Sequence, residues 1–262
     1  MILSIVIPAQ NESQAVATTV ENLHARLHSK SIPHEILIVD DHSTDKTADV
    51  LSDLTARLSV VRWIRNEGPA GYGYAVRAGF QAYSGDAVCI VMADASDDPA
   101  DVVTYYRKLQ EGFDCVFGSR FMPGARVLNY PWPKWILNRI ANRLIAVLFR
   151  VPYNDWTNAF KAFRREVING VQPTLSSRFE LTVELPLKAM VRGYSYTVVP
   201  THWYGRTRGV SKLKIAEMGS AYARVVVYIL LEKWLSRGDS RRVQTRGAPS
   251  AQHSESRSRS SF

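Results

Sequence analysis

Three aspartates follow an apolar run near the middle of the chain, and this loop holds the residues best suited to chemistry. The run 87–91 is typical of a buried strand, and Asp94, Asp97 and Asp98 come soon after it. In open α/β sheets, ligands bind at the carboxyl ends of the strands. Crowded carboxylates favour Mg²⁺ or Mn²⁺ carrying a phosphorylated substrate. The alternative is a solvated loop in which Asp98 caps a helix that begins with Pro99.

Polar residues also follow the first two apolar runs. The first run ends in Pro8, Ala9, Asn11 and Glu12, and the second ends in Asp40 and Asp41. A nucleotide base and its ribose need hydrogen-bond acceptors of this kind. Helix capping by Asn11 and Ser43 is the simpler explanation, and we expect it to account for part of the pattern. Three such sites on consecutive strands of one sheet would form a single crevice.

These sites require a sheet that brings the strand ends together. Apolar runs predict strands over 2–7, 35–39, 60–64, 87–92 and 114–117, and helical patterns lie between them at 13–29, 45–58, 72–83 and 101–110. We expect residues 11–13 to open the first helix and residues 43–45 to open the second. Strands that alternate with helices predict an α/β fold with a mostly parallel, Rossmann-like sheet flanked by helices.

The second half of the chain has a different pattern. Residues 135–151 and 218–235 predict amphipathic helices, and a late strand is expected within 192–203. Apolar faces flanked by Arg, Lys, Trp and Tyr suit a membrane surface, but packing on the core or self-association explains them nearly as well. The Ser/Arg-rich stretch 238–262 is expected to be a disordered basic tail.

The composition favours anionic partners. The 262-residue chain carries a net charge of +9, which suits phosphates, anionic lipid or nucleic acid. Cys89 and Cys115 lie in apolar runs and are expected to be core residues. We find neither a signal peptide nor a clear transmembrane run. A nucleic-acid-binding protein is the competing class, but the tail lacks interleaved aromatic residues, so we expect no nucleic-acid partner.

Several of these motifs occur together in one known family. They are the segments 6–12, 39–45, 71–75 with Asn66, the Asp94 loop and 118–121. In this order the chain resembles the family 2 glycosyltransferases with the GT-A fold, over residues 1–214. The resemblance implies a GT-A catalytic domain over 1–214. The sequence pattern adds an amphipathic helix over 215–237, for which membrane-surface and core-packing interpretations both stay open, and the basic tail over 238–262. Gly71 and Gly73 lack the third glycine of a dinucleotide fingerprint, so that interpretation is rejected.

The last third narrows the resemblance to polyprenyl-phosphate hexosyltransferases. The segment 155–163 is similar to their Asp-x-Thr-x-Gly-Phe-Arg motif, and 206–213 is similar to their Arg-x-x-Gly-x-Ser-Lys-Leu motif. Such basic and hydroxyl side chains suit a phosphate. The first motif commonly has a glycine and an arginine where this chain has Asn158-Ala159 and Lys161. The chain also has Ser96 in the Asp94 loop. The first departure bears on the sugar or acceptor pocket, and Ser96 leaves open which carboxylate joins Asp94 at the metal.

The resemblance implies inverting transfer of a hexose, mannose by default, from a nucleotide-diphosphate sugar to a polyprenyl or dolichyl phosphate. Its alternative is transfer to a sugar or lipid hydroxyl. The implied donor-binding residues are Pro8, Ala9, Asn11, Glu12, Asp40, Asp41, Asn66, Gly71 and Asp94. Asp94 and Asp97 (alternatively Asp98) would hold Mg²⁺ or Mn²⁺. The implied catalytic residues are Asp94, Arg120, Arg206 and Lys212, and the implied acceptor-phosphate residues are Arg139, Arg206, Ser211 and Lys212.

The implied acceptor, a polyprenyl phosphate, bears both on the need for a catalytic base and on where the enzyme works. A phosphate is already anionic near neutral pH and needs no strong base, and residues 179–185 hold no clear catalytic carboxylate pair. We expect a peripheral enzyme at the cytoplasmic face of a membrane, with a membrane-anchoring partner protein left open.

Overall fold

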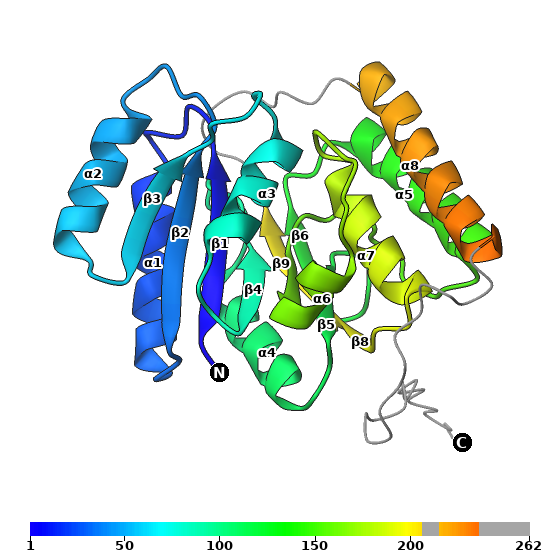
Figure 1. Cartoon of the computed structure of the whole chain (residues 1–262), viewed down its shortest axis with the longest axis horizontal. Helices are drawn as coiled ribbons and strands as arrows, with labels where there is room; N and C mark the ends of the chain where they lie inside the picture. Colours follow the sequence, from blue (N-terminus) through cyan, green and yellow to red (C-terminus); the bar gives the residue numbers. More distant parts are fainter. Residues whose placement is uncertain (206–214, 236–262) are drawn as a thin grey trace.

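A seven-stranded sheet organises the molecule, in the order β3-β2-β1-β4-β7-β5-β8 (Figure 1). The structure is a computed structural model that describes residues 1–205 and 215–235. The strands are β1 (Leu3–Ala9), β2 (His34–Asp40), β3 (Val61–Arg65), β4 (Ala87–Ile90), β5 (Cys115–Ser119), β6 (Arg126–Leu128), β7 (Lys161–Arg164), β8 (Tyr196–Pro200) and β9 (His202–Tyr204). The helices are α1 (Val16–Ser29), α2 (Thr47–Arg57), α3 (Tyr72–Ala82), α4 (Pro99–Gln110), α5 (Trp132–Phe149), α6 (Arg165–Gly170), α7 (Leu181–Val191) and α8 (Ile215–Leu235).

The mostly parallel α/β sheet predicted from the sequence is confirmed. All pairs from β3 to β4 are parallel, and β5 pairs in parallel with β8. The exception is β7, which lies antiparallel between β4 and β5 and which the sequence pattern missed. The predicted late strand is divided in two: β8 joins the main sheet, whereas β9 pairs with β6 in a small second sheet.

Buried side chains pack on both faces of the sheet. One core joins β1 and β2 to α1, α2 and α4, and the other joins the sheet to α3, α6 and α7. The central strands β1 and β4 are buried along their whole length, which explains their uninterrupted apolar runs. Cys89 and Cys115 are free thiols buried in these cores, as predicted.

Helices α5 and α8 lie side by side at one end of the molecule (Figure 1). Each packs a few apolar side chains inward, including Ile145 and Phe149 of α5 and Ile229 of α8. Each also exposes an apolar face; the exposed side chains are Trp132, Trp135, Ile136, Leu137, Ile140, Leu144, Val147 and Leu148 of α5 and Val227, Tyr228, Leu231, Trp234 and Leu235 of α8. In the part of the chain that the structure describes, no helix has the length and apolar character needed to span a bilayer.

Candidate active site

The loops after β2 and β3 build a polar corner around one carboxylate. Asp41 accepts hydrogen bonds from the Asn66 side-chain amide and from the Gly71 backbone N–H, both at 2.8 Å. Asp40 lies beside it and accepts from the Ser43 N–H at 3.2 Å. Asp40, Asp41 and Asn66 are all buried. The structure therefore brings together residues predicted to bind the nucleotide from three separate segments.

Asn11 ties the loop after β1 to the loop after β2. Its backbone has a φ of 55°, and its side-chain oxygen accepts from the Thr44 N–H at 2.7 Å. The prediction that residues 11–13 open the first helix is wrong, because α1 begins at Val16 and has no side-chain cap. Asn11 instead joins two strand ends, which sequence pattern alone cannot distinguish from a cap. Pro8 and Ala9 end β1, and Glu12 follows, so they lie at the same sheet edge.

The first turn of α3 packs tightly against residues 176–178. A β-carbon at Gly73 would lie 2.6 Å from the Ser176 carbonyl oxygen and 2.7 Å from the Ser177 carbonyl carbon. The Gly73 N–H also donates to the Ser177 carbonyl at 3.0 Å. This close backbone contact requires glycine and fixes the segment before α7 beside the Asp41 corner.

We expect Gly73→Ala to lower the free energy of unfolding by about 1–3 kcal/mol, because backbone atoms must shift to admit the methyl group. Chemical denaturation followed by circular dichroism measures the change. Gly219→Ala in α8 is the matched control, since nothing lies within 4 Å of its added β-carbon. That control should be neutral or slightly stabilising. Equal effects at the two positions would contradict this account of the packing.

The aspartate loop follows β4 and places two carboxylates close together. Asp94 accepts from the Ser96 N–H at 3.1 Å, and Asp97 accepts from the Met92 N–H at 3.0 Å. Asp97 is only 8% exposed. Burial raises the pKa of Asp97 to about 7, and the nearby Asp94 charge adds to the rise. A cation beside this pair would relieve both effects.

Asp98 has a different role in the same loop. Its carboxylate accepts from the Ala100 N–H at 2.8 Å and caps α4, which begins at Pro99. The capping interpretation is therefore confirmed for Asp98, and it favours Asp97 as the partner of Asp94. Among residues 1–205 and 215–235, no three carboxylate, imidazole or thiol side chains are grouped to hold a metal ion by themselves.

Strand β9 holds the aspartate loop from the other side. The Tyr204 N–H donates to the Ser96 carbonyl at 2.9 Å, and Trp203 forms an isolated antiparallel bridge with Asp97. His202 donates its N–H to Asp101 at 2.6 Å. The predicted acceptor residues Arg206, Ser211 and Lys212 follow β9 in the chain, but they lie outside the described residues.

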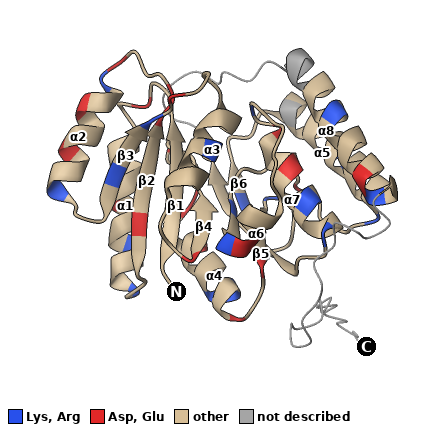
Figure 2. Ribbon diagram, in the orientation of Figure 1, with Lys and Arg blue, Asp and Glu red and all other residues tan. Residues whose placement is uncertain are grey.

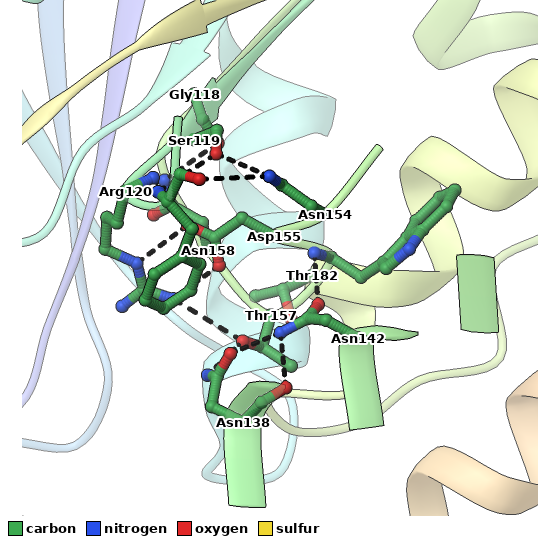
Figure 3. A network of polar contacts seen from close by, with 12 residues as sticks. Gly118, Ser119, Arg120, Asn138, Asn142, Asn154, Asp155, Thr157, Asn158 and Thr182 are labelled. Carbon is green, nitrogen blue, oxygen red and sulfur yellow. Dashed lines mark hydrogen bonds and ion pairs between the residues drawn. The ribbon is translucent and has the colours of Figure 1, made fainter. Parts of the chain in front are cut away.

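Arg120 lies at the end of β5 in a buried ion pair with Asp155 (Figure 3). Its Nε and Nη2 atoms contact the two carboxylate oxygens at 2.9 and 2.7 Å, and its backbone N–H donates to the same carboxylate. Burial lowers the pKa of Arg120, but the charge of Asp155 and its hydrogen bonds to the guanidinium raise it, and the net pKa lies above its usual value. Sequence reasoning did not identify Asp155 as this partner, although it lies in the quoted 155–163 motif.

Arg139 of α5 lies near the same ion pair. Its guanidinium stacks on the Phe121 ring at 4.6 Å, and Arg120 lies 5.5 Å from the centroid of that ring. Arg139 also donates to the Asn154 carbonyl at 3.3 Å. Arg120, a predicted catalytic residue, and Arg139, a predicted acceptor-phosphate residue, therefore lie against one aromatic ring, where α5 meets the end of β5.

Glu184 of α7 and Glu180, which precedes the helix, are engaged in structural contacts. Glu184 pairs with Lys188 at 2.8 Å and accepts from the Leu175 and Ser176 N–H groups. Glu180 accepts from the Ser177 N–H at 3.0 Å. These contacts hold both carboxylates in the packing around the start of α7.

The fold is that of GT-A glycosyltransferases. Glucosyl-3-phosphoglycerate synthase from Mycobacterium tuberculosis, solved with Mn²⁺ and UDP-glucose, matches with a TM-score of 0.66 at 20% identity over 88% of this chain and 78% of that chain. The family model "Glycosyl transferase family 2" matches residues 4–171. The chain belongs to this family and is a glycosyltransferase.

Two curated relatives are similar over most of this chain. Polyprenol monophosphomannose synthase from Mycolicibacterium smegmatis is 31% identical over 84% of this chain and 84% of its own length. Dolichol-phosphate mannosyltransferase from Pyrococcus furiosus is 30% identical over 82% of this chain and 60% of its own length. The chain thus spans less than two thirds of the second relative.

Proposed function

We propose that the protein transfers a hexose, with mannose favoured, from a nucleotide-diphosphate sugar to a polyprenyl or dolichyl-type phosphate, with inversion. The names of the two curated relatives support this acceptor and sugar. The Asp40, Asp41, Asn66 and Gly71 corner suits the nucleotide, since it offers buried acceptors at the strand edge.

The observation that carries the proposal is the position of α5. This helix exposes an apolar face of eight side chains, while its Arg139 reaches the Arg120 region at the other side. A polyprenyl phosphate has the same two parts, an apolar chain and an anionic head. Its tail would lie along α5 and α8, and its phosphate would meet Arg139 and Arg120, with Arg206, Ser211 and Lys212 as further sequence-based candidates.

A divalent cation fits the aspartate loop as part of the donor complex. Asp94 and Asp97 would hold Mg²⁺ or Mn²⁺, and the diphosphate and water would supply the other oxygen ligands. The fit rests on two neighbouring carboxylates, one of them buried with a raised pKa. The ion would stabilise the charge that develops on the leaving nucleotide. Arg120 and Arg139 would orient the acceptor phosphate, whose oxygen attacks without a general base.

The α5–α8 face would then place the enzyme at the cytoplasmic face of a membrane. Arg143 of α5 and Arg224 of α8 are both exposed. Figure 2 shows basic residues along α8. Each basic residue near an anionic surface contributes about 1 kcal/mol to membrane binding. The same face is also compatible with binding to a membrane protein that anchors the enzyme.

The double variant Ile140→Gln/Val147→Gln should bind anionic vesicles about tenfold more weakly or worse, because two exposed apolar side chains are lost from the face. Vesicle co-sedimentation measures the affinity. Leu175→Gln removes an equally exposed apolar side chain outside α5 and α8 and should change nothing. Unchanged vesicle binding by the double variant would remove α5 from the membrane contact.

Replacing the acceptor polyprenyl phosphate with the neutral alcohol polyprenol tests the proposed reaction. Transfer should occur to polyprenyl phosphate and not to polyprenol, because the neutral alcohol lacks both the nucleophilic phosphate oxygen and the charge that Arg120 and Arg139 would bind. Equal transfer to polyprenol, or transfer to a sugar hydroxyl alone, would instead favour the hydroxyl-acceptor branch of the family.

A further inference from the structure

Lys161 is a buried lysine that the proposed mechanism does not yet use. It begins β7, between β4 and β5, and is 1% exposed. Its ammonium donates to the carbonyl oxygens of Trp156, at 3.0 Å, and of Asn158. Among the residues that the structure describes, no carboxylate forms an ion pair with it. A buried ammonium whose hydrogen-bond partners are neutral carbonyls is costly, which points to a specific role.

The carbonyls that Lys161 holds belong to the turn 155–158, which joins three parts of the site (Figure 3). Asp155 pairs with Arg120 at the end of β5. Thr157 accepts from Asn138 of α5 at 2.6 Å. Asn158 donates to the Gly118 carbonyl of β5 at 3.1 Å. Lys161 therefore fixes the turn that connects the Arg120 ion pair to the helix bearing the exposed apolar face.

The charge of Lys161 also changes the net charge around the Arg120–Asp155 ion pair. The charges of Arg120 and Asp155 cancel within their ion pair, so the pair alone offers little attraction to an anion. A protonated Lys161 beneath the turn adds one positive charge in a buried, weakly screened position. The group as a whole is then positive, as an incoming phosphate requires.

We propose that Lys161 is a positioning residue whose buried ammonium holds the 155–158 turn and gives the Arg120–Asp155 pair the net positive charge that the acceptor phosphate needs. This inference rests on the proposed function, since it assumes an anionic acceptor at Arg120. It assigns a role to a residue at which this chain departs from the arginine common in similar sequences.

The surroundings of Lys161 make this role sensitive to pH. Burial lowers the pKa of Lys161 to about 7, Asp155 opposes the shift and Arg120 adds to it. Tyr153 also faces it, with its ring centroid 5.8 Å from Nζ. Above neutral pH the ammonium should lose its proton, and with it the extra positive charge. An arginine at this position would keep its charge throughout.

The test compares wild type with Lys161→Arg and Lys161→Met, measuring KM for polyprenyl phosphate and for the donor from pH 6 to 9. In wild type we expect the acceptor KM to rise about tenfold across this range, while the donor KM changes less than threefold. Lys161→Arg should show no such rise, and Lys161→Met should have the high acceptor KM at every pH. Titration of the acceptor itself is common to all three proteins and cancels in the comparison.

Three outcomes would overturn the role. They are an equal alkaline rise in Lys161→Arg, an unchanged acceptor KM in Lys161→Met, and equal effects on donor and acceptor. Absence of any lipid product from wild type would instead refute the proposed function, and the inference with it.

A second measurement needs no substrate. Lys161 has a lower pKa in the folded than in the unfolded protein, so the unfolded state binds more protons between the two pKa values. Above pH 7 the urea midpoint of wild type should therefore rise relative to that of Lys161→Arg. A constant difference between the two midpoints would overturn the pH-dependent part of the role.

Discussion

Asp94→Asn should reduce transfer by about a thousandfold or more while leaving the protein folded, because the substitution removes the charge that would hold the cation at the donor diphosphate. Its carboxylate accepts a hydrogen bond from the Ser96 N–H at 3.1 Å, which an asparagine oxygen can also accept. Initial rates at saturating Mg²⁺ or Mn²⁺, together with a thermal unfolding curve, measure both effects.

Asp98→Asn is the matched control for this result, since it makes the same substitution four residues along the same loop. Asp98 caps α4, and asparagine is an equally good helix cap. Its transfer rate should stay within about twofold of wild type, since the cap is kept. If Asp94→Asn kept wild-type turnover, or if both variants lost activity equally, the assignment of the metal to Asp94 would be contradicted.

Asp155→Asn should destabilise the protein by about 3–5 kcal/mol, because it leaves the guanidinium of Arg120 buried without its counter-charge. Asp155 is completely buried, and its carboxylate receives three hydrogen bonds from Arg120. Urea denaturation measures the loss in free energy of unfolding. Transfer should also fall, since the ion pair orients Arg120 beside the proposed acceptor phosphate.

Asp53→Asn provides the comparison for a surface ion pair. Asp53 pairs with Arg57 at 2.8 Å, but the two side chains are 64% and 48% exposed. Solvent screens such a pair, so its loss should cost less than about 1 kcal/mol. A similar cost for Asp155→Asn would mean that the Arg120 ion pair contributes no more than a surface contact.

Most of the sheet could be predicted because its central strands are buried on both faces. Residues 3–9 and 36–39 are therefore mostly apolar and leave little choice of structure. Strand β7 was missed because it is four residues long and begins and ends with basic residues, Lys161 and Arg164. Its apolar surroundings come from β4 and β5, which are distant in sequence.

The candidate site was predictable at the strand ends and less so elsewhere. Asp40, Asp41 and Asn66 could be placed together because parallel strands end at one edge. The pairing of Arg120 with Asp155 joins residues 35 positions apart and depends on the path of α5 between them, which no local pattern specifies. Asn11 resembled a helix cap because capping and loop-bridging use the same side chain.

The most direct test of the central claim is transfer from a panel of radiolabelled nucleotide sugars to polyprenyl phosphate in detergent, with Mg²⁺ or Mn²⁺ and with EDTA. We predict a chloroform-soluble product from one donor, GDP-mannose by preference, that forms only when the metal is present. Metal-dependent donor hydrolysis without any lipid product would contradict the proposed acceptor.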